Sequence, residues 1–207
     1  MKHTRISVTD LDSYQYYLTS ELSLDDFLRR LRRQDPPTEA MAAGIAWHNV
    51  LELAQEGQSI GKIDMDGFSF HVKATASISL PPIRELKGEK VYWFGDLGVT
   101  LVGVVDGMDG VTVIDHKLTG RPDMERFASS WQWKAYLEMF GGQRFDYYVY
   151  GYKTHESEPK FYEIASVDHL PLYRYPDMGS QVEGFLAELA RFKVEHTPDL
   201  VHHYDGY

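Results

Sequence analysis

Residues 101–120 read LVGVVDGMDGVTVIDHKLTG, and this stretch decides the fold of the chain. Two runs rich in β-branched residues meet at Asp109-Gly110, and such a dipeptide between apolar runs is the strongest short-range hairpin signal in a sequence. With these two residues as the loop, Asp106 on the first strand faces Val113 on the second. The stretch therefore predicts a β-hairpin.

The predicted hairpin carries three charged side chains. Because side chains alternate along a strand, Asp115 and Lys117 share a face, and Asp106 lies diagonal to Asp115 at roughly 7–8 Å. Charges in a half-buried strand cost free energy unless they are paired or bind something. The pattern predicts an acid–acid–base cluster on one face, two carboxylates reaching one cation. The alternative is that Lys117 only neutralises Asp115 as an ion pair on a solvated strand.

Composition limits the classes of protein. The 207 residues suit one domain, and 43% hydrophobic content with 14% aromatic residues is typical of a globular chain. There are no cysteines, which excludes disulfides, thiolate zinc sites and cysteine-held iron–sulfur clusters. Any metal must use Asp, Glu, His or backbone oxygens, which favours Mg²⁺ or Mn²⁺. The net charge of −10 argues against a general nucleic-acid coat protein.

The sequence shows neither a membrane span nor a secretion signal. No apolar run has the length of a membrane span, and the first residues lack the apolar core of a signal peptide. We expect a cytoplasmic protein, or one in the host cytoplasm if it is encoded by a phage.

The order of elements predicts an α/β layered domain with a mixed sheet. An arginine-rich helix lies near residues 24–33, and a second helix over 38–56 begins at the Thr38 cap and ends at Gly57. About three strands occupy 63–105, before the hairpin. We expect one domain over 1–207, with an N-terminal helical part over 1–57, a sheet core over 58–165 into which a helix over 122–140 is inserted, and a C-terminal helix and tail over 166–207.

The hairpin supplies one of three motifs that follow one another along the chain. They are Gly44-x-x-x-His48, the core Gly103-Val-Val-Asp106 with Ile114-Asp-His-Lys117, and Gln132-x-x-x-Tyr136. In this order they resemble the RecB-like branch of the PD-(D/E)xK nuclease superfamily, which includes phage and mitochondrial exonucleases. The resemblance spans about residues 5–150 and implies a restriction-endonuclease-like core, a mixed central β-sheet flanked by α-helices. Many relatives hold an iron–sulfur cluster through four cysteines, and this chain has none.

The resemblance also implies roles for the core residues. Asp106, Asp115 and the backbone carbonyl of His116 would bind the metal, and hard divalent ions accept such oxygens. His48 corresponds to the branch's histidine ligand, and a histidine suits Mn²⁺ better than Mg²⁺. Lys117 would orient or deprotonate the attacking water and neutralise the phosphate.

Other assignments have clear alternatives. Glu85 occupies the place of the family's additional acid, with Glu89 as its rival, and either can be an exposed turn glutamate. Gln132 and Tyr136 share one helix face, which borders the active site and contacts DNA in the family. The alternative for Tyr136 is a purely structural place in the core.

Basic residues cluster in the helix FLRRLRRQ. Arg29 and Arg33 lie one turn apart there and would bind DNA phosphates, whereas the alternative is a plain solvated helix face.

The expected function is a metal-dependent DNA exonuclease of recombination, repair or phage DNA processing, with Mg²⁺ or Mn²⁺ as cofactor. Its expected partners are DNA and a single-strand-annealing or other recombination protein. One alternative is a nucleic-acid-binding relative of the fold that lacks catalysis. Another is a metal-free two-carboxylate hydrolase, which would leave Lys117 unexplained.

Overall fold

The structure, a computed structural model, describes residues 1–55, 61–73 and 80–203. Its helices are α1 (Val8–Thr19), α2 (Leu24–Leu31), α3 (Glu39–Leu53), α4 (Met124–Ser129), α5 (Trp131–Phe140) and α6 (Met178–His196), with a short 3-10 turn at Pro198–Leu200. Its strands are β1 (Lys2–Ser7), β2 (Lys62–Met65), β3 (Phe68–Val72), β4 (Ile83–Phe94), β5 (Leu97–Asp109), β6 (Thr112–Thr119), β7 (Arg144–His155), β8 (Glu158–Tyr173) and β9 (Val201–His203).

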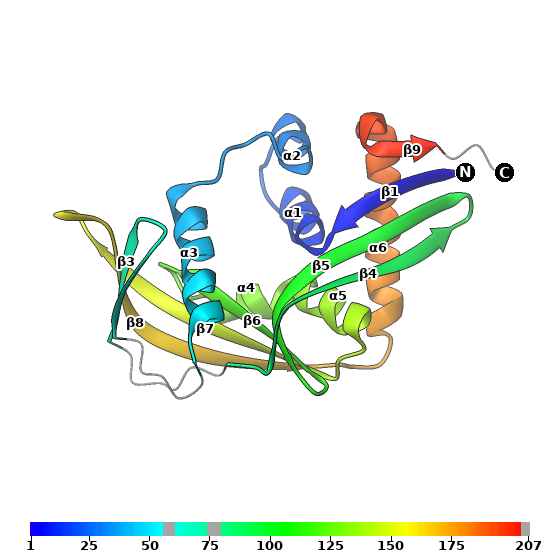
Figure 1. Ribbon diagram of the computed structural model, residues 1–207. Coiled ribbons are helices and arrows are strands. Elements are labelled where there is room, and N and C mark those ends of the chain that lie inside the picture. The colour runs from blue at the N-terminus through cyan, green and yellow to red at the C-terminus, as the bar shows by residue number, and fades with distance from the viewer. Residues whose placement is uncertain (56–60, 74–79, 204–207) are drawn as a thin grey trace.

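Within those ranges the strands form one nine-stranded mixed sheet in the order β2-β3-β8-β7-β6-β5-β1-β9, and β4 pairs with β5 off this path. The pairs β1–β5, β6–β7 and β3–β8 are parallel, and the other pairs are antiparallel. Helices lie on both sides of the sheet (Figure 1), as α1, α5 and α6 pack on one side and α3 covers part of the other. The result is a layered α/β core.

Strand β5 is the centre of the arrangement because it has three partners. Strand β4 pairs along almost its whole length on one edge. The other edge is shared: β1 pairs with residues 97–102, and β6 pairs with residues 107–109. No described strand pairs with residues 103–106 on that edge. The sheet therefore opens beside Asp106.

Two apolar cores hold the layers together. The larger core joins α1, α5 and α6 to the sheet through fully buried side chains such as Leu11, Leu137 and Leu186. The smaller core seats Trp47 of α3 on β3 and β7, where its ring contacts Phe70 and Tyr150 at centroid distances of 5.3 and 5.1 Å. Burying such side chains stabilises each by about 1.5–3 kcal/mol, so α3 is fixed against the sheet.

The loop of the central hairpin differs from the prediction. Strands β5 and β6 are joined by Gly110–Val111 rather than by Asp109–Gly110, and Gly110 has a left-handed φ of 56°. The carbonyl of Val111 accepts backbone hydrogen bonds from Gln143 and Arg144, at the start of β7. These contacts come from a distant part of the chain, so a local turn signal does not reveal them.

The new loop shifts the cross-strand partner of each residue by two positions. Gly107 now pairs with Ile114, and continuing this register places Asp106 level with Asp115 instead of diagonal to it. The ladder between the two strands has only three pairs, which end at Gly107. Asp106 and Asp115 therefore stand where the strands begin to separate.

Element bounds differ from the prediction in several places. The segment 1–57, predicted to be helical, also contains β1, which pairs with the distant β5. The helix predicted over 38–56 is α3, with Thr38 as its cap as predicted, but it ends at Leu53, and Gly57 lies outside the described residues. At the C-terminal end, β8 extends to Tyr173, and β9 adds a strand to the expected tail.

The helix predicted over 122–140 is broken into α4 and α5 at Ser130. The Asp12 carboxylate of α1 accepts hydrogen bonds from the Ser130 hydroxyl and the Trp131 backbone, both at 2.7 Å. Because an acid from another helix satisfies these groups, a second helix begins at this point.

Within the described ranges, none of the helices combines the length and hydropathy needed to cross a lipid bilayer.

Candidate metal and phosphate site

Asp106 lies in the opening of the sheet. Its Oδ2 atom accepts the backbone N–H of His116 at 2.6 Å, which bridges the gap between β5 and β6. Its Oδ1 atom lies 3.0 Å from Nδ1 of His48, on α3. Burial alone would raise the pKa of Asp106, but these hydrogen bonds and nearby positive charge outweigh burial and lower the pKa. Asp106 is therefore an anion joined to both sides of the opening.

His48 reaches Asp106 because α3 is anchored by the aromatic side chain before it. Trp47 is fully buried, and His48, the next residue, is partly exposed toward the sheet opening. Burial opposes protonation of His48, but the hydrogen bond and charge of Asp106 outweigh burial and raise its pKa. The structure thus brings together two residues that lie 58 positions apart in the sequence.

Glu85 joins the same group from β4. One ligand atom from each of His48, Glu85 and Asp106 lies within 4.8 Å of the other two. The pKa of Glu85 is raised, mainly by burial and to a smaller extent by the charge of Asp106. The rival acid, Glu89, pairs with Val102 farther along the β4–β5 ladder. Of the two glutamates, the structure brings only Glu85 into this group.

Backbone geometry directs Glu85 and Asp106 to the site. Glu85 has a φ of 50°, a left-handed conformation that costs a non-glycine residue roughly 1–3 kcal/mol. In a regular strand Arg84 and Leu86 would lie on the same face. Here Leu86 packs toward the core of α1 and α5, whereas Arg84 contacts α3 on the opposite face. Strand β4 therefore bends at Glu85, which lies level with Asp106 of β5.

Asp115 and Lys117 lie beside this group on β6. Nζ of Lys117 lies 2.7 Å from Oδ2 of Asp115 in an ion pair. The Lys117 side chain is 26% exposed, and the Asp115 side chain is 4% exposed. Oδ2 is buried, and the ammonium of Lys117 is its charged partner. Burial, opposed by Lys117 and reinforced by Asp106, raises the pKa of Asp115 to about 6.

Lys117 keeps its proton in this environment. Burial alone would lower its pKa, but the charges of Asp115 and Asp106 outweigh burial and raise the pKa. Its ammonium also lies 5.8 Å from the ring centroid of Tyr147, a cation–π contact. An ammonium held in this way can donate hydrogen bonds and neutralise an anion, but it is a poor base.

The His116 side chain is almost fully buried. Its Nδ1 lies 3.1 Å from the Tyr150 hydroxyl, in the interior. Burial lowers the pKa of this imidazole to about 4, so it is neutral at neutral pH. The predicted role of His116 as a ligand through its backbone carbonyl stays a prediction.

Two supporting residues carry no signal in the sequence. Nη1 of Arg84 donates to three carbonyls at the end of α3, those of Leu51, Glu52 and Ala54, at 3.2, 2.6 and 2.8 Å. Arg84 precedes Glu85, so this contact ties the histidine helix to the bend in β4. Asp12 supports the start of α5 in the same long-range manner.

Gln132 and Tyr136 of α5 are both buried. The Tyr136 hydroxyl donates to the carbonyl of Val104 at 2.7 Å, two residues before Asp106, and its ring contacts Phe145. Tyr136 thus supports β5 from the core side of the sheet. Contact of these two residues with DNA stays a prediction.

Gly103 is required by the Tyr136 ring. A Cβ atom at Gly103 would lie 2.5 Å from a Tyr136 ring carbon and 3.0 Å from Val8. We expect Gly103→Ala to lower the free energy of unfolding by about 1–3 kcal/mol through this overlap. The matched control is Gly44→Ala in α3, where nothing lies within 4 Å, and which should raise it by about 0.5–1 kcal/mol. Urea unfolding measures both changes. Wild-type stability of Gly103→Ala would contradict this packing.

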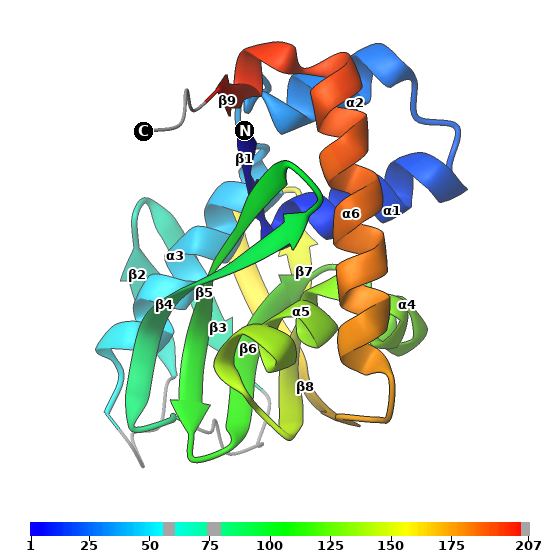
Figure 2. The ribbon, with the colours of Figure 1, turned by 90° about the vertical axis from the view of Figure 1, so that its right-hand side faces the viewer.

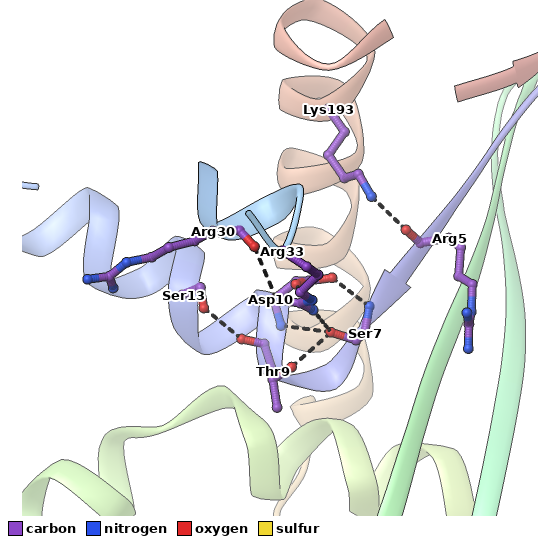
Figure 3. A network of polar contacts seen from close by, with 8 residues as sticks. All are labelled: Arg5, Ser7, Thr9, Asp10, Ser13, Arg30, Arg33 and Lys193. Carbon is purple, nitrogen blue, oxygen red and sulfur yellow. Dashed lines mark hydrogen bonds and ion pairs between the residues drawn. The ribbon is translucent and has the colours of Figure 1, made fainter. Parts of the chain in front are cut away.

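The arginine cluster is already bound to acids of the chain. Arg29 lies 2.5 Å from Asp26, and Arg33 lies 2.5 Å from Asp10. Figure 3 shows Arg33 within a network that includes Ser7 and Asp10. The prediction that Arg29 and Arg33 lie one helical turn apart is wrong, because α2 ends at Leu31 and Arg33 has a left-handed φ of 55°. Their contact with DNA stays a prediction, and it would require these pairs to open.

A small cavity lies among the converging groups. Its volume is about 10 Å³, and its lining includes His48, Glu85, Asp106, Arg84 and His116. This volume suits about one water-sized occupant. The ligand groups around it are one imidazole and two carboxylates, and the buried carboxylate of Asp115 lies on the neighbouring strand β6. Oxygen donors with one histidine fit Mg²⁺ or Mn²⁺, so the residues present suit a divalent cation.

Comparison with known proteins supports the fold. No protein-family model matches the sequence, and no curated protein matches it. Among solved structures, an exonuclease candidate from Eubacterium rectale aligns with a TM-score of 0.53 and 10% identity over 96% of this chain and 83% of its own. The structure of SSO0001 aligns with a TM-score of 0.51 and 15% identity over 91% of this chain and 76% of its own. Together with the mixed sheet flanked by helices, these likenesses confirm the predicted restriction-endonuclease-like α/β fold.

Proposed function

We propose that the chain is a divalent-metal-dependent deoxyribonuclease of the RecB-like type that hydrolyses phosphodiester bonds from a DNA end. The observation that carries this proposal is the convergence of His48, Glu85 and Asp106 around one small cavity, with the Asp115–Lys117 pair beside it. The same proposal includes a role in recombination, repair or phage DNA processing, with a recombination protein as partner.

The residues that would hold the cation are His48, Glu85, Asp106 and Asp115. When bound, a divalent cation supplies Lewis-acid stabilisation of the negative charge that develops on the phosphate. The backbone N–H of His116 fixes the orientation of the Asp106 carboxylate at 2.6 Å. Arg84 and Trp47 hold α3 so that the His48 ring stays directed at the cavity.

Lys117 has a separate part in the proposed reaction. Because its pKa is raised, the ammonium would donate a hydrogen bond to a phosphate oxygen or orient the water molecule. Preorganised positive charge in a site that excludes bulk water is one of the largest contributions to catalysis. This ammonium favours phosphodiester hydrolysis over a metal-free reaction that uses two carboxylates alone.

The test is digestion of end-labelled single- and double-stranded DNA with Mg²⁺ or Mn²⁺ and with EDTA. We expect cleavage that depends on the cation, and we expect His48→Ala to lower it strongly. The matched control is His169→Ala, since His169 forms a similar pair with Asp146 at 3.1 Å on a different part of the sheet. Cleavage that survives EDTA would favour a metal-free hydrolase. Binding of DNA without any cleavage would favour the relative that lacks catalysis.

A further inference from the structure

One side of the sheet is open to solvent beyond the site. Strands β1, β5 and β4 bury Ile6, Val99 and Tyr92 against the helices. Figures 1 and 2 show α6 on this covered side of the β4–β5 pair. On the opposite side, Trp93 is 57% exposed and Val91 is 52% exposed. Trp93 and Val91 are neighbours on this face, and contiguous exposed apolar side chains, unlike isolated ones, mark interaction surfaces.

The residues of this open face lie in rows across three strands, and we call them the sheet track. By the strand registers, the rows are His3, Gly98 and Trp93; then Arg5, Thr100 and Val91; then Ser7, Val102 and Glu89; then Val104 and Lys87. The next level of the ladder holds Asp106 and Glu85. The distance from Gly98 to Asp106 is eight residues, or about 26 Å along the strand. The sheet track therefore leads directly to the proposed catalytic site.

Trp93 is held in place at the far end of the sheet track. A Cβ atom at Gly98 would lie 3.0 Å from the Trp93 ring and 2.8 Å from the His3 ring, so both rings close over this glycine. His3 is itself fixed by Thr100, with Nε2 and Oγ1 3.0 Å apart. The tryptophan thus has one side supported by protein and more than half of its surface in solvent. This is the arrangement of a preformed stacking surface.

Charge on the sheet track differs from that of the whole chain. Arg5 and Lys87 are exposed cations that form no ion pair with any described residue. Figure 3 shows the Arg5 side chain directed away from α6, while its backbone carbonyl accepts from Lys193 at 2.6 Å. Glu89 is the only acid in the four rows. In a chain of net charge −10, this face offers a polyanion two cations that are unpaired within the described part of the chain.

We propose that the sheet track binds single-stranded DNA, with a base stacked on Trp93 and phosphates near Arg5 and Lys87. This inference rests on the proposed nuclease function and names the form of its substrate. Proteins that bind single strands combine cations along the backbone with aromatic side chains under the bases. A duplex keeps its bases stacked on one another, so only an unpaired strand offers a base to Trp93.

The test measures binding without cleavage, by fluorescence anisotropy of a labelled oligothymidylate in EDTA. We expect Trp93→Ala to weaken binding about tenfold, as loss of one stacked base does, and Trp93→Phe to restore most of it. We expect Arg5→Ala to weaken binding and to reduce the salt dependence by about one phosphate contact. The matched controls are Tyr173→Ala, an exposed aromatic residue on β8, and Arg191→Ala, an exposed cation on α6. Both should bind as the wild type does.

Two further measurements separate this inference from the proposed function. Calorimetry with Mn²⁺ should give the wild-type affinity in Trp93→Ala, because Trp93 lies far from the acids.

If the protein binds oligothymidylate through Trp93 but cleaves no DNA, the sheet track stands and the nuclease proposal fails. Wild-type oligothymidylate binding by Trp93→Ala, in a protein that cleaves DNA, would overturn the sheet track alone. If that variant binds normally but changes the sedimentation coefficient, the face is an interface between copies of the chain, and the inference is overturned.

Discussion

Lys117→Met is expected to lower the rate of DNA cleavage by roughly 10²–10⁴-fold, the usual contribution of a positioned proton-donating or charge-stabilising side chain. Methionine keeps most of the length of the side chain and removes its charge. The affinity for Mn²⁺ should change little, since the ammonium is not a ligand. Single-turnover cleavage of end-labelled DNA and calorimetry with Mn²⁺ measure the two effects.

The same variant should also lose stability in metal-free buffer. Without Lys117, the Asp115 carboxylate is a buried charge with no ion-pair partner, and such a group is costly. The loss should be larger at pH 8 than at pH 5, because a protonated Asp115 needs no partner. The matched control is Lys90→Met, which breaks the 2.9 Å pair of Lys90 with Glu138 in another part of the fold and should leave cleavage unchanged. A wild-type cleavage rate in Lys117→Met would reduce Lys117 to an ion-pair partner.

Asp115→Asn is expected to raise the stability of the metal-free protein at neutral pH. The pKa of Asp115 is raised from an ordinary value of 3.8 to about 6, first by burial and then by Asp106, even though Lys117 opposes the change. The folded state therefore holds a proton at pH values where the unfolded chain has released it. The ionised carboxylate thus destabilises the fold above about pH 6, and this cost vanishes below about pH 4.

The expected gain follows from that shift. Asp115→Asn should raise the free energy of unfolding by up to roughly 3 kcal/mol at pH 7–8, with the gain falling toward zero near pH 4. Thermal unfolding at a series of pH values in EDTA measures it. With Mn²⁺ the wild type should become more stable than Asp115→Asn, because it would bind the cation more tightly and gain more stability from it.

A second buried acid supplies the matched control. Asp146 is also buried, but it contacts Arg144 at 2.8 Å and His169 at 3.1 Å. Asp146→Asn should therefore lower the stability at neutral pH, since it weakens contacts that hold the carboxylate. A loss of stability in Asp115→Asn at pH 7 would show that the Lys117 pair outweighs the burial of the carboxylate.

The sequence by itself determined the chemistry that the chain can offer. Alternating β-branched residues on both sides of a glycine turn specify a hairpin, because side-chain alternation and turn conformation are local properties. The same stretch places Asp106, Asp115 and Lys117 close to one another on neighbouring strands. The absence of cysteine limits any metal ligands to oxygen and imidazole nitrogen. The strongly helical segment before the sheet likewise predicted α3 and its Thr38 cap, since capping also acts within a few residues.

Only the tertiary structure decided which groups meet. His48 reaches Asp106 because Trp47 is buried against β3 and β7, and Glu85 reaches them through a left-handed bend in β4. The arginines that favoured a phosphate site in the sequence are paired with acids, whereas Arg5, which carried no signal, lies on the open face and pairs with no acid among the residues that the structure describes. The hairpin register likewise depends on backbone contacts of Val111 with the start of β7. The Arg29–Asp26 pair is local, but the contacts of Trp47, Arg33 and Val111 join residues far apart along the chain. The strength of these long-range contacts depends on how the layers pack, and short-range patterns carry no record of it.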